Sequence, residues 1–128
     1  MTAWDEAVAA IDAAWADDAA LTIASPLPWA PGTGADALVS YVNEVTIHSW
    51  DLAQATGQAV AWDDDVLELA ISRMAFLPET GRAALFAPMK AGLPPHLRDA
   101  PDPYLDAVPV PAEAPLIARL VAWSGRQP

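Results

Sequence analysis

The chain has 128 residues, no cysteine and a formal net charge of −11. This length suffices for one domain with a modest core, and 54% hydrophobic residues with 18% charged residues predict a folded globular protein. The lack of cysteine excludes disulfides, thiolate nucleophiles and Cys-based zinc sites, so any metal must be held by His, Asp and Glu.

Charge is distributed unevenly along the chain. All six basic residues follow position 72, whereas twelve of the seventeen acidic residues precede it. Such an acidic surface repels phosphate backbones, so we expect no nucleic-acid partner. No apolar run approaches the roughly 20 residues that cross a bilayer, and MTAWDEAVAA lacks the basic start of a signal peptide. We therefore expect a cytoplasmic protein with no membrane partner.

Apolar spacing and capping residues predict a mostly α protein. The first helix is expected over residues 2–19, where Thr2 can cap and Asp5 stands at the third helical position. The following stretch, LTIASPLPWAPGTG, contains three prolines and two glycines and cannot be helical. Its first four residues, 21–24, form a candidate short strand before a loop rich in turns.

Two further helices are expected in the middle of the chain. One should begin near Gly34–Asp36 and end before Gly57, with an apolar stripe made of Leu38, Tyr41, Val45 and Leu52. The other should follow the acidic turn Asp63-Asp64-Asp65 and run to about Leu77. Its inward-facing residues are expected to be Val66, Leu69, Ala70 and Met74.

The chain changes character at Pro78, because ten of its thirteen prolines lie from there on. Most of this part is expected to be irregular chain that wraps a helical body, or else a partly mobile loop, closed by a last helix near Pro115–Ser124. We expect a single helical domain over 1–128. Bundle helices would occupy 1–77, and the proline-rich wrap with the C-terminal helix would occupy 78–128.

The stretch VNEVTIHSWDLAQATG in the second expected helix carries a candidate metal site. On a helix, His48 lies about 40° from Glu44 and Asp51 about 20° to the other side, so the three form one stripe. Imidazole and carboxylate one turn apart suit Zn²⁺, Ni²⁺, Fe²⁺ or Mn²⁺, and Asp51 could orient the imidazole from the second shell of ligands. The same spacing is also typical of a surface ion pair.

The motif E-x-x-x-H-S-W-D-L-A-Q-A-T-G resembles the central motif of the DinB-like helical bundles. It is most similar to the branch named for mycothiol-dependent maleylpyruvate isomerase, whose members commonly read E-x-x-x-H-G-W-D-L-A-R-A-T-G. The closing segment VPVPAEAPLIARLVAWSGRQP and the residues before the motif resemble this branch as well. The resemblance thus covers nearly the whole chain.

This resemblance implies a divalent-metal site of the His/Glu/His type, with Glu44 and His48 as two ligands. Among the metals that suit imidazole and carboxylate, Zn²⁺ is the first candidate. It also implies metal-assisted thiol transfer or isomerisation with a low-molecular-weight thiol. The family's bundle begins with two further helices, the second of which carries the first histidine ligand, and that ligand has no counterpart here. Positions 54 and 49 are Gln and Ser where relatives often have Arg and Gly. His96, the other histidine, is expected to be a loop residue rather than the missing ligand.

Half of a four-helix bundle would expose apolar surface, and burying that surface should drive association. We therefore expect a homodimer that brings Glu44 and His48 of both chains together, or a partner chain that supplies the missing helices. The alternative is a non-catalytic helical dimerisation module, or a truncated family member with no functional metal site.

Overall fold

The computed structural model describes residues 2–25 and 32–128. Every regular element in these ranges is a helix, apart from one isolated β-bridge, which confirms the mostly α prediction. That these helices form half of a DinB-like four-helix bundle stays a prediction. None of the helices in the described ranges combines the length and the apolarity needed to cross a bilayer. The chain divides into two compact units, Met1–Val42 and Asn43–Pro128, each described below by itself, and the single domain expected over 1–128 stays a prediction.

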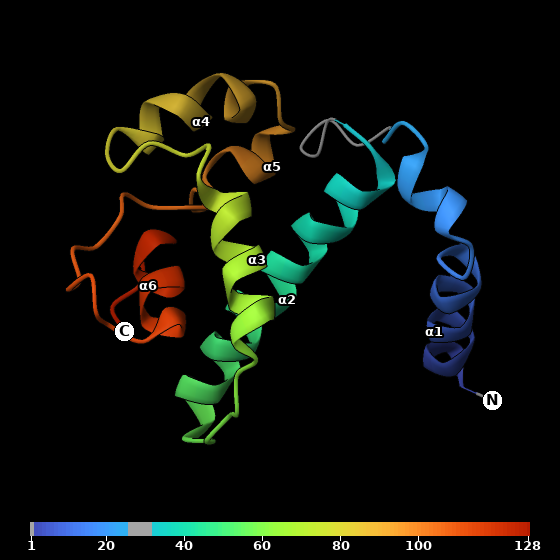
Figure 1. Cartoon of the computed structure of the whole chain (residues 1–128). Coiled ribbons are helices and arrows are strands. Elements are labelled where there is room, and N and C mark those ends of the chain that lie inside the picture. Colours follow the sequence, from blue (N-terminus) through green and yellow to red (C-terminus); the bar gives the residue numbers. More distant parts are fainter. Residues whose placement is uncertain (1, 26–31) are drawn as a thin grey trace. The chain divides into compact units, whose positions relative to one another are not determined.

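Helix α1 (Ala3–Ala14) opens the first unit, at the cap that the sequence predicts (Figure 1). The Thr2 hydroxyl accepts the Asp5 N–H at 3.2 Å, and the Thr2 N–H donates to the Asp5 carboxylate at 2.8 Å. These reciprocal bonds satisfy backbone donors that the first turn would otherwise leave unpaired. The helix ends at Ala14, five residues earlier than expected.

The predicted short strand over residues 21–24 is wrong. Asp18–Thr22 forms a short 3₁₀ helix, η1, and only Ala24 pairs with another segment, in an antiparallel bridge to Thr33. Most of the predicted loop after this point, residues 26–31, lies outside the described residues.

Helix α2 (Gly34–Thr56) begins and ends where the sequence predicts. The Thr33 N–H and hydroxyl donate to the Asp36 carboxylate at 2.7 and 3.0 Å, which caps the first turn. Gly34 is required by close packing, because an added Cβ would lie 2.1 Å from a carbonyl oxygen of η1. Gly57 has a φ of +67°, the left-handed conformation that commonly ends a helix.

The core of the second unit lies where α3 (Asp64–Met74) packs against α6 (Leu116–Trp123) and against α2 (Figure 1). The buried Asn43 amide of α2 donates to the Ala70 carbonyl of α3 at 3.1 Å. The Trp123 indole N–H of α6 donates to the Met74 carbonyl at 2.9 Å. The buried hydrophobic residues of this core are Ile47, Leu67, Ala70, Met74, Leu77 and Leu120.

The apolar stripe predicted for α2 does not face this core. The helix instead buries a face that contains Asn43, Thr46, Ile47 and Ala53. This orientation lets the buried Asn43 amide find a backbone partner on α3, which a polar group in a core requires. Tyr41, Val45 and Leu52 are exposed, and Leu38 is half-buried.

The prediction for helix α3 contains a smaller error of the same kind. Asp63 caps it as predicted, and Ala70 and Met74 are buried as predicted. The helix ends at Met74 rather than near Leu77. It buries Leu67 in place of the expected Val66 and Leu69, which are exposed.

The proline-rich part of the chain is more helical than expected. It contains α4 (Arg82–Ala91), bounded by Gly81 and Gly92, and the four-residue α5 (Pro95–Arg98). Alanine, leucine, methionine and lysine favour helix strongly enough for α4 to form even with Pro88 inside it. Residues 99–114 contain no helix, and α6 follows Pro115 as predicted.

A buried arginine, Arg82, joins three segments of the second unit. Its guanidinium donates to the carbonyls of Pro78 at 2.5 Å and Leu105 at 2.7 Å, and also to that of Trp123. Its backbone N–H donates to the Asp106 carboxylate at 2.9 Å. Arg82 therefore holds the segments around Leu105 and Trp123, which carry Tyr104 and Arg126. These two residues contact the candidate site described below.

Candidate functional site

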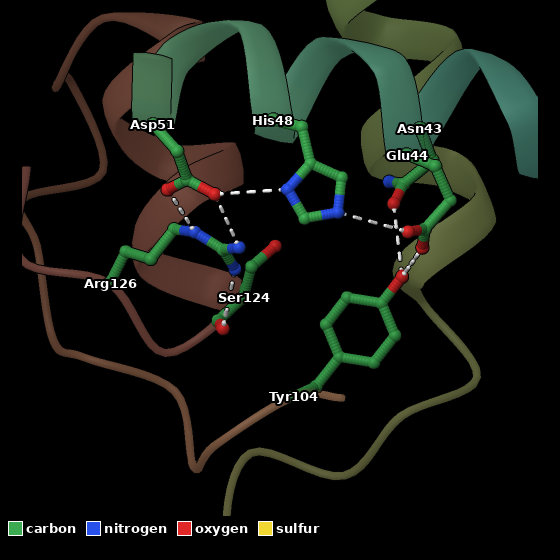
Figure 2. A network of polar contacts seen from close by, with 7 residues as sticks. All are labelled: Asn43, Glu44, His48, Asp51, Tyr104, Ser124 and Arg126. Atoms are coloured by element: carbon green, nitrogen blue, oxygen red, sulfur yellow. Dashed lines mark hydrogen bonds and ion pairs between the residues drawn. The ribbon is translucent and has the colours of Figure 1, made fainter. Parts of the chain in front are cut away.

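The His48 imidazole lies between two carboxylates of α2 (Figure 2). Its Nε2 is 3.5 Å from Glu44 Oε2, and its Nδ1 is 3.2 Å from Asp51 Oδ2. The three side chains share one helix face because they are spaced one turn apart, as the sequence predicts. The His48 side chain is 65% exposed, so a ligand can reach it from solvent.

Asp51 is held in place by Arg126, which comes from the chain just after α6 (Figure 2). The Arg126 Nε donates to Asp51 Oδ1 at 2.6 Å, and its Nη2 donates to Oδ2 at 2.8 Å. These bonds lower the pKa of the Asp51 carboxyl and raise the pKa of the guanidinium. An ionised carboxylate only accepts hydrogen bonds, so Nδ1 of His48 must be the donor toward Asp51. In a neutral ring, Nε2 then carries a free lone pair.

Glu44 is held in place by Tyr104, from the irregular segment between α5 and α6 (Figure 2). The Tyr104 hydroxyl donates to Glu44 Oε1 and lies 3.3 Å from the Asn43 side-chain oxygen. Burial of the ring, and then the hydrogen bond to Glu44, raise the pKa of the Tyr104 phenol. The phenol therefore stays a protonated donor. Glu44 Oε1 accepts the hydrogen bond from this phenol, and Glu44 Oε2 is the oxygen that faces His48.

Sequence reasoning missed both supporting residues. Tyr104 lies 60 residues from Glu44, and Arg126 lies 75 residues from Asp51, so no local motif joins them. One signal could have found the arginine. Because every basic residue follows position 72, any cationic partner of the acidic helix α2 must come from the second half of the chain.

Glu44 and His48 fit a metal as a pair. Two ligands of a tetrahedral Zn²⁺, each about 2.0–2.1 Å from the ion, are separated by roughly 3.4 Å. The measured separation of Oε2 and Nε2 is 3.5 Å. Asp51 sits behind the imidazole, on Nδ1, where metal-binding histidines commonly meet a carboxylate.

The described residues bring these two candidate ligands together but not a complete set. No three His, Asp or Glu side chains in the described part of the chain converge as a metal site. His96 lies on α5 rather than in a loop, and its side chain is exposed. The arrangement can therefore contribute half of a coordination sphere.

The chain is similar to two relatives from Mycobacterium tuberculosis. They are "Uncharacterized protein MT0763" of strain CDC 1551 / Oshkosh and "Uncharacterized protein Rv0738" of strain ATCC 25618 / H37Rv. Each is 35% identical over 83 residues, which make up 65% of this chain and 37% of the relative. The chain therefore spans little more than a third of the length of these curated relatives. No family profile matches the chain, and no solved structure matches it.

Proposed function

We propose that this chain binds a divalent transition metal through Glu44 Oε2 and His48 Nε2. The observation that supports it is their 3.5 Å separation, which is close to the roughly 3.4 Å between two ligands of one tetrahedral ion. Zn²⁺ is the first candidate because it accepts imidazole and carboxylate without a geometric preference of its own. Ni²⁺, Fe²⁺ and Mn²⁺ are alternatives.

The surroundings of the pair also support metal binding rather than a simple surface ion pair. A surface ion pair needs only two charges, and such pairs contribute about 0–1 kcal/mol. Here each candidate ligand has its own partner, Asp51 for His48 and Tyr104 for Glu44. Partners of this kind fix the tautomer and the orientation of metal ligands.

We further propose that the chain is a DinB-like helical protein of the mycothiol-dependent maleylpyruvate isomerase type. A bound metal would supply Lewis acidity and would lower the pKa of a coordinated thiol or water. The residues of this chain would bind the metal, orient the imidazole and leave positions open for further donors and a low-molecular-weight thiol. The proposal includes a cytoplasmic location, where such thiols stay reduced.

A second candidate is a non-catalytic helical dimerisation module. Two observations favour it: the described residues offer only two ligands, and α2 turns the apolar Val45 and Leu52 outward. An exposed apolar helix face is a common protein–protein contact.

Metal analysis of the purified chain separates these two candidates. We expect the wild type to retain a transition metal, and both His48→Ala and Glu44→Gln to lose it. His96→Ala is the matched control, because it removes the other histidine from an exposed helix away from the pair. If the wild type contained no metal, metal binding by this pair would be overturned. The same holds if the His48 and His96 variants lost metal to an equal extent.

A further inference from the structure

Gly125 ends α6 and turns the chain toward the candidate site. Its φ is +84°, and its N–H donates to the Ala122 carbonyl at 3.0 Å. The Arg126 N–H donates to the Val121 carbonyl at 3.0 Å, which completes a Schellman motif. This place in the motif requires the left-handed conformation, which glycine adopts without strain. The turn lets the Arg126 guanidinium meet Asp51.

Gly125 also lies against the segment that carries Tyr104. An added Cβ would be 2.6 Å from the Leu105 Cβ and 3.0 Å from the Leu105 Cα and carbonyl carbon. Carbon atoms that are not bonded to each other pack best about 3.5–4.0 Å apart, so only glycine fits this contact. The Arg82 guanidinium donates to the carbonyls of Leu105 and Trp123, so it holds the same two segments together.

The contact between Gly125 and Leu105 therefore lies between the two supporting residues of the site. Tyr104 immediately precedes Leu105, and Arg126 immediately follows Gly125. Figure 2 shows the side chains of Tyr104 and Arg126 reaching toward α2 at the two ends of one polar network. The absence of a side chain at position 125 sets how closely their two segments approach each other.

We infer that Gly125 is a positioning residue of the candidate metal site. Because it has no Cβ, the segment of Leu105 comes close enough for Tyr104 to hold Glu44. This inference rests on the proposed function, in which Glu44 is a metal ligand.

A side chain at position 125 would move the Leu105 segment rather than α6. Leu105 is 59% exposed and belongs to irregular chain, whereas α6 contributes buried residues to the core. Relieving a 2.6 Å contact requires a shift of about 1 Å. Tyr104 would move with its neighbour, and a hydrogen bond of ordinary length is broken when it is stretched by about 1 Å. Glu44 would then lose the donor that holds it.

An asparagine substitution tests this close contact separately from the backbone turn. Asparagine tolerates the left-handed conformation, so Gly125→Asn keeps the turn and adds the Cβ. Gly57→Asn is the matched control, because Gly57 also has a positive φ but an added Cβ there would meet no other part of the described chain within 4 Å. We expect metal affinity to fall about tenfold in Gly125→Asn and less than about twofold in the control. Equal losses in the two variants would overturn the inference.

A second substitution distinguishes the contact from a general loss of stability. Leu105→Gly removes the Cβ that the Gly125→Asn side chain would strike, whereas Leu105→Ala keeps it. Combined with Gly125→Asn, only Leu105→Gly should recover most of the lost metal affinity. If Gly125→Asn alone were too unstable to study, Leu105→Gly should restore folding as well. Equal behaviour of the two double variants would overturn the inference.

Exchange of the Tyr104 hydroxyl proton with water, measured by NMR in the metal-free protein, separates this inference from the proposed function. The hydrogen bond to Glu44 protects this proton, so we expect exchange to be roughly tenfold faster in Gly125→Asn but not in Gly57→Asn. Unchanged exchange in Gly125→Asn would overturn the inference even if the wild type binds metal. A wild type without metal would overturn the proposed function, and the exchange rates would still decide whether Gly125 holds Tyr104 against Glu44.

Discussion

Arg126 and Asp51 form an ion pair with two hydrogen bonds across 75 residues of sequence. The pair joins the end of the chain to α2, and the same carboxylate holds Nδ1 of His48. The orientation of the candidate metal ligand thus depends on a residue that its own helix does not contain.

Arg126→Lys should weaken both stability and metal binding. Lysine keeps the positive charge but cannot reproduce the planar two-bond contact. We expect a loss of about 1 kcal/mol in the free energy of unfolding, measured by urea denaturation of the metal-free protein. Metal affinity should fall about tenfold, as for other residues that orient a ligand. Arg119→Lys, at an exposed position of α6, is the control. Equal effects of the two variants would contradict a specific role for Arg126.

Tyr104→Phe tests the support of Glu44. This change keeps the ring in its partly buried place and removes only the hydroxyl that donates to Glu44. We expect metal affinity to fall about tenfold while the circular dichroism spectrum stays the same. Titration with a colorimetric chelator measures the affinity. Ser72→Ala, which removes an exposed hydroxyl on α3, should change it less than twofold, and an equal loss in both variants would argue against the role of Tyr104.

Arg82→Met should be the most destabilising of these variants. Methionine fills similar space but leaves the carbonyls of Pro78, Leu105 and Trp123 without their buried donor. Each buried polar group left unsatisfied costs about 1–3 kcal/mol. Because three carbonyls lose their donor, we expect the free energy of unfolding to fall by at least about 3 kcal/mol. Thermal denaturation should show it as a clearly lower Tm than that of Arg119→Met. A Tm within a few degrees of wild type would show that Arg82 does not join these segments.

The stability of the fold should fall in acid partly through Asp106. The backbone N–H groups of Arg82 and Gly81 donate to this carboxylate and lower its pKa in the folded state. The stabilisation is therefore present above the unfolded pKa of about 3.9 and is lost as the pH falls through the lower folded value. Asp106→Asn should flatten the acid limb of a plot of stability against pH. Glu113→Gln, at an exposed turn position, is the control, and identical acid limbs for wild type and Asp106→Asn would contradict the prediction.

Local signals predicted much of the helical structure. Thr2 and Asp63 cap their helices as expected, and α2 spans Gly34–Thr56 between the predicted start and Gly57. Such features depend on backbone groups within a few residues, so a sequence can specify them without its tertiary contacts.

The packed faces could not be predicted in the same way. Hydrophobicity alone favoured Val45 and Leu52 as inward residues of α2, yet the structure buries Asn43 and Thr46. The buried Asn43 is satisfied by a carbonyl of α3, 27 residues away. A polar residue becomes a core residue only when such a partner is in place, and the pattern of one helix does not contain that information.

The candidate site also combines residues placed by local helical spacing with residues placed by tertiary packing. Glu44, His48 and Asp51 lie within two turns of one helix, and their juxtaposition followed from helical spacing. Tyr104 and Arg126 reach them only through the packing of the C-terminal half, which Arg82 organises. The candidate ligands and Asp51 were therefore readable from sequence, and the long-range partners Tyr104 and Arg126 were not.

The most direct test of metal binding is a crystal of the chain grown with Zn²⁺ and measured with X-rays at the zinc absorption edge. We expect an anomalous peak about 2.0–2.2 Å from His48 Nε2 and from a carboxylate oxygen of Glu44, with Asp51 still bonded to Nδ1. A well-ordered site with no peak at His48, or a zinc peak at His96 instead, would contradict it.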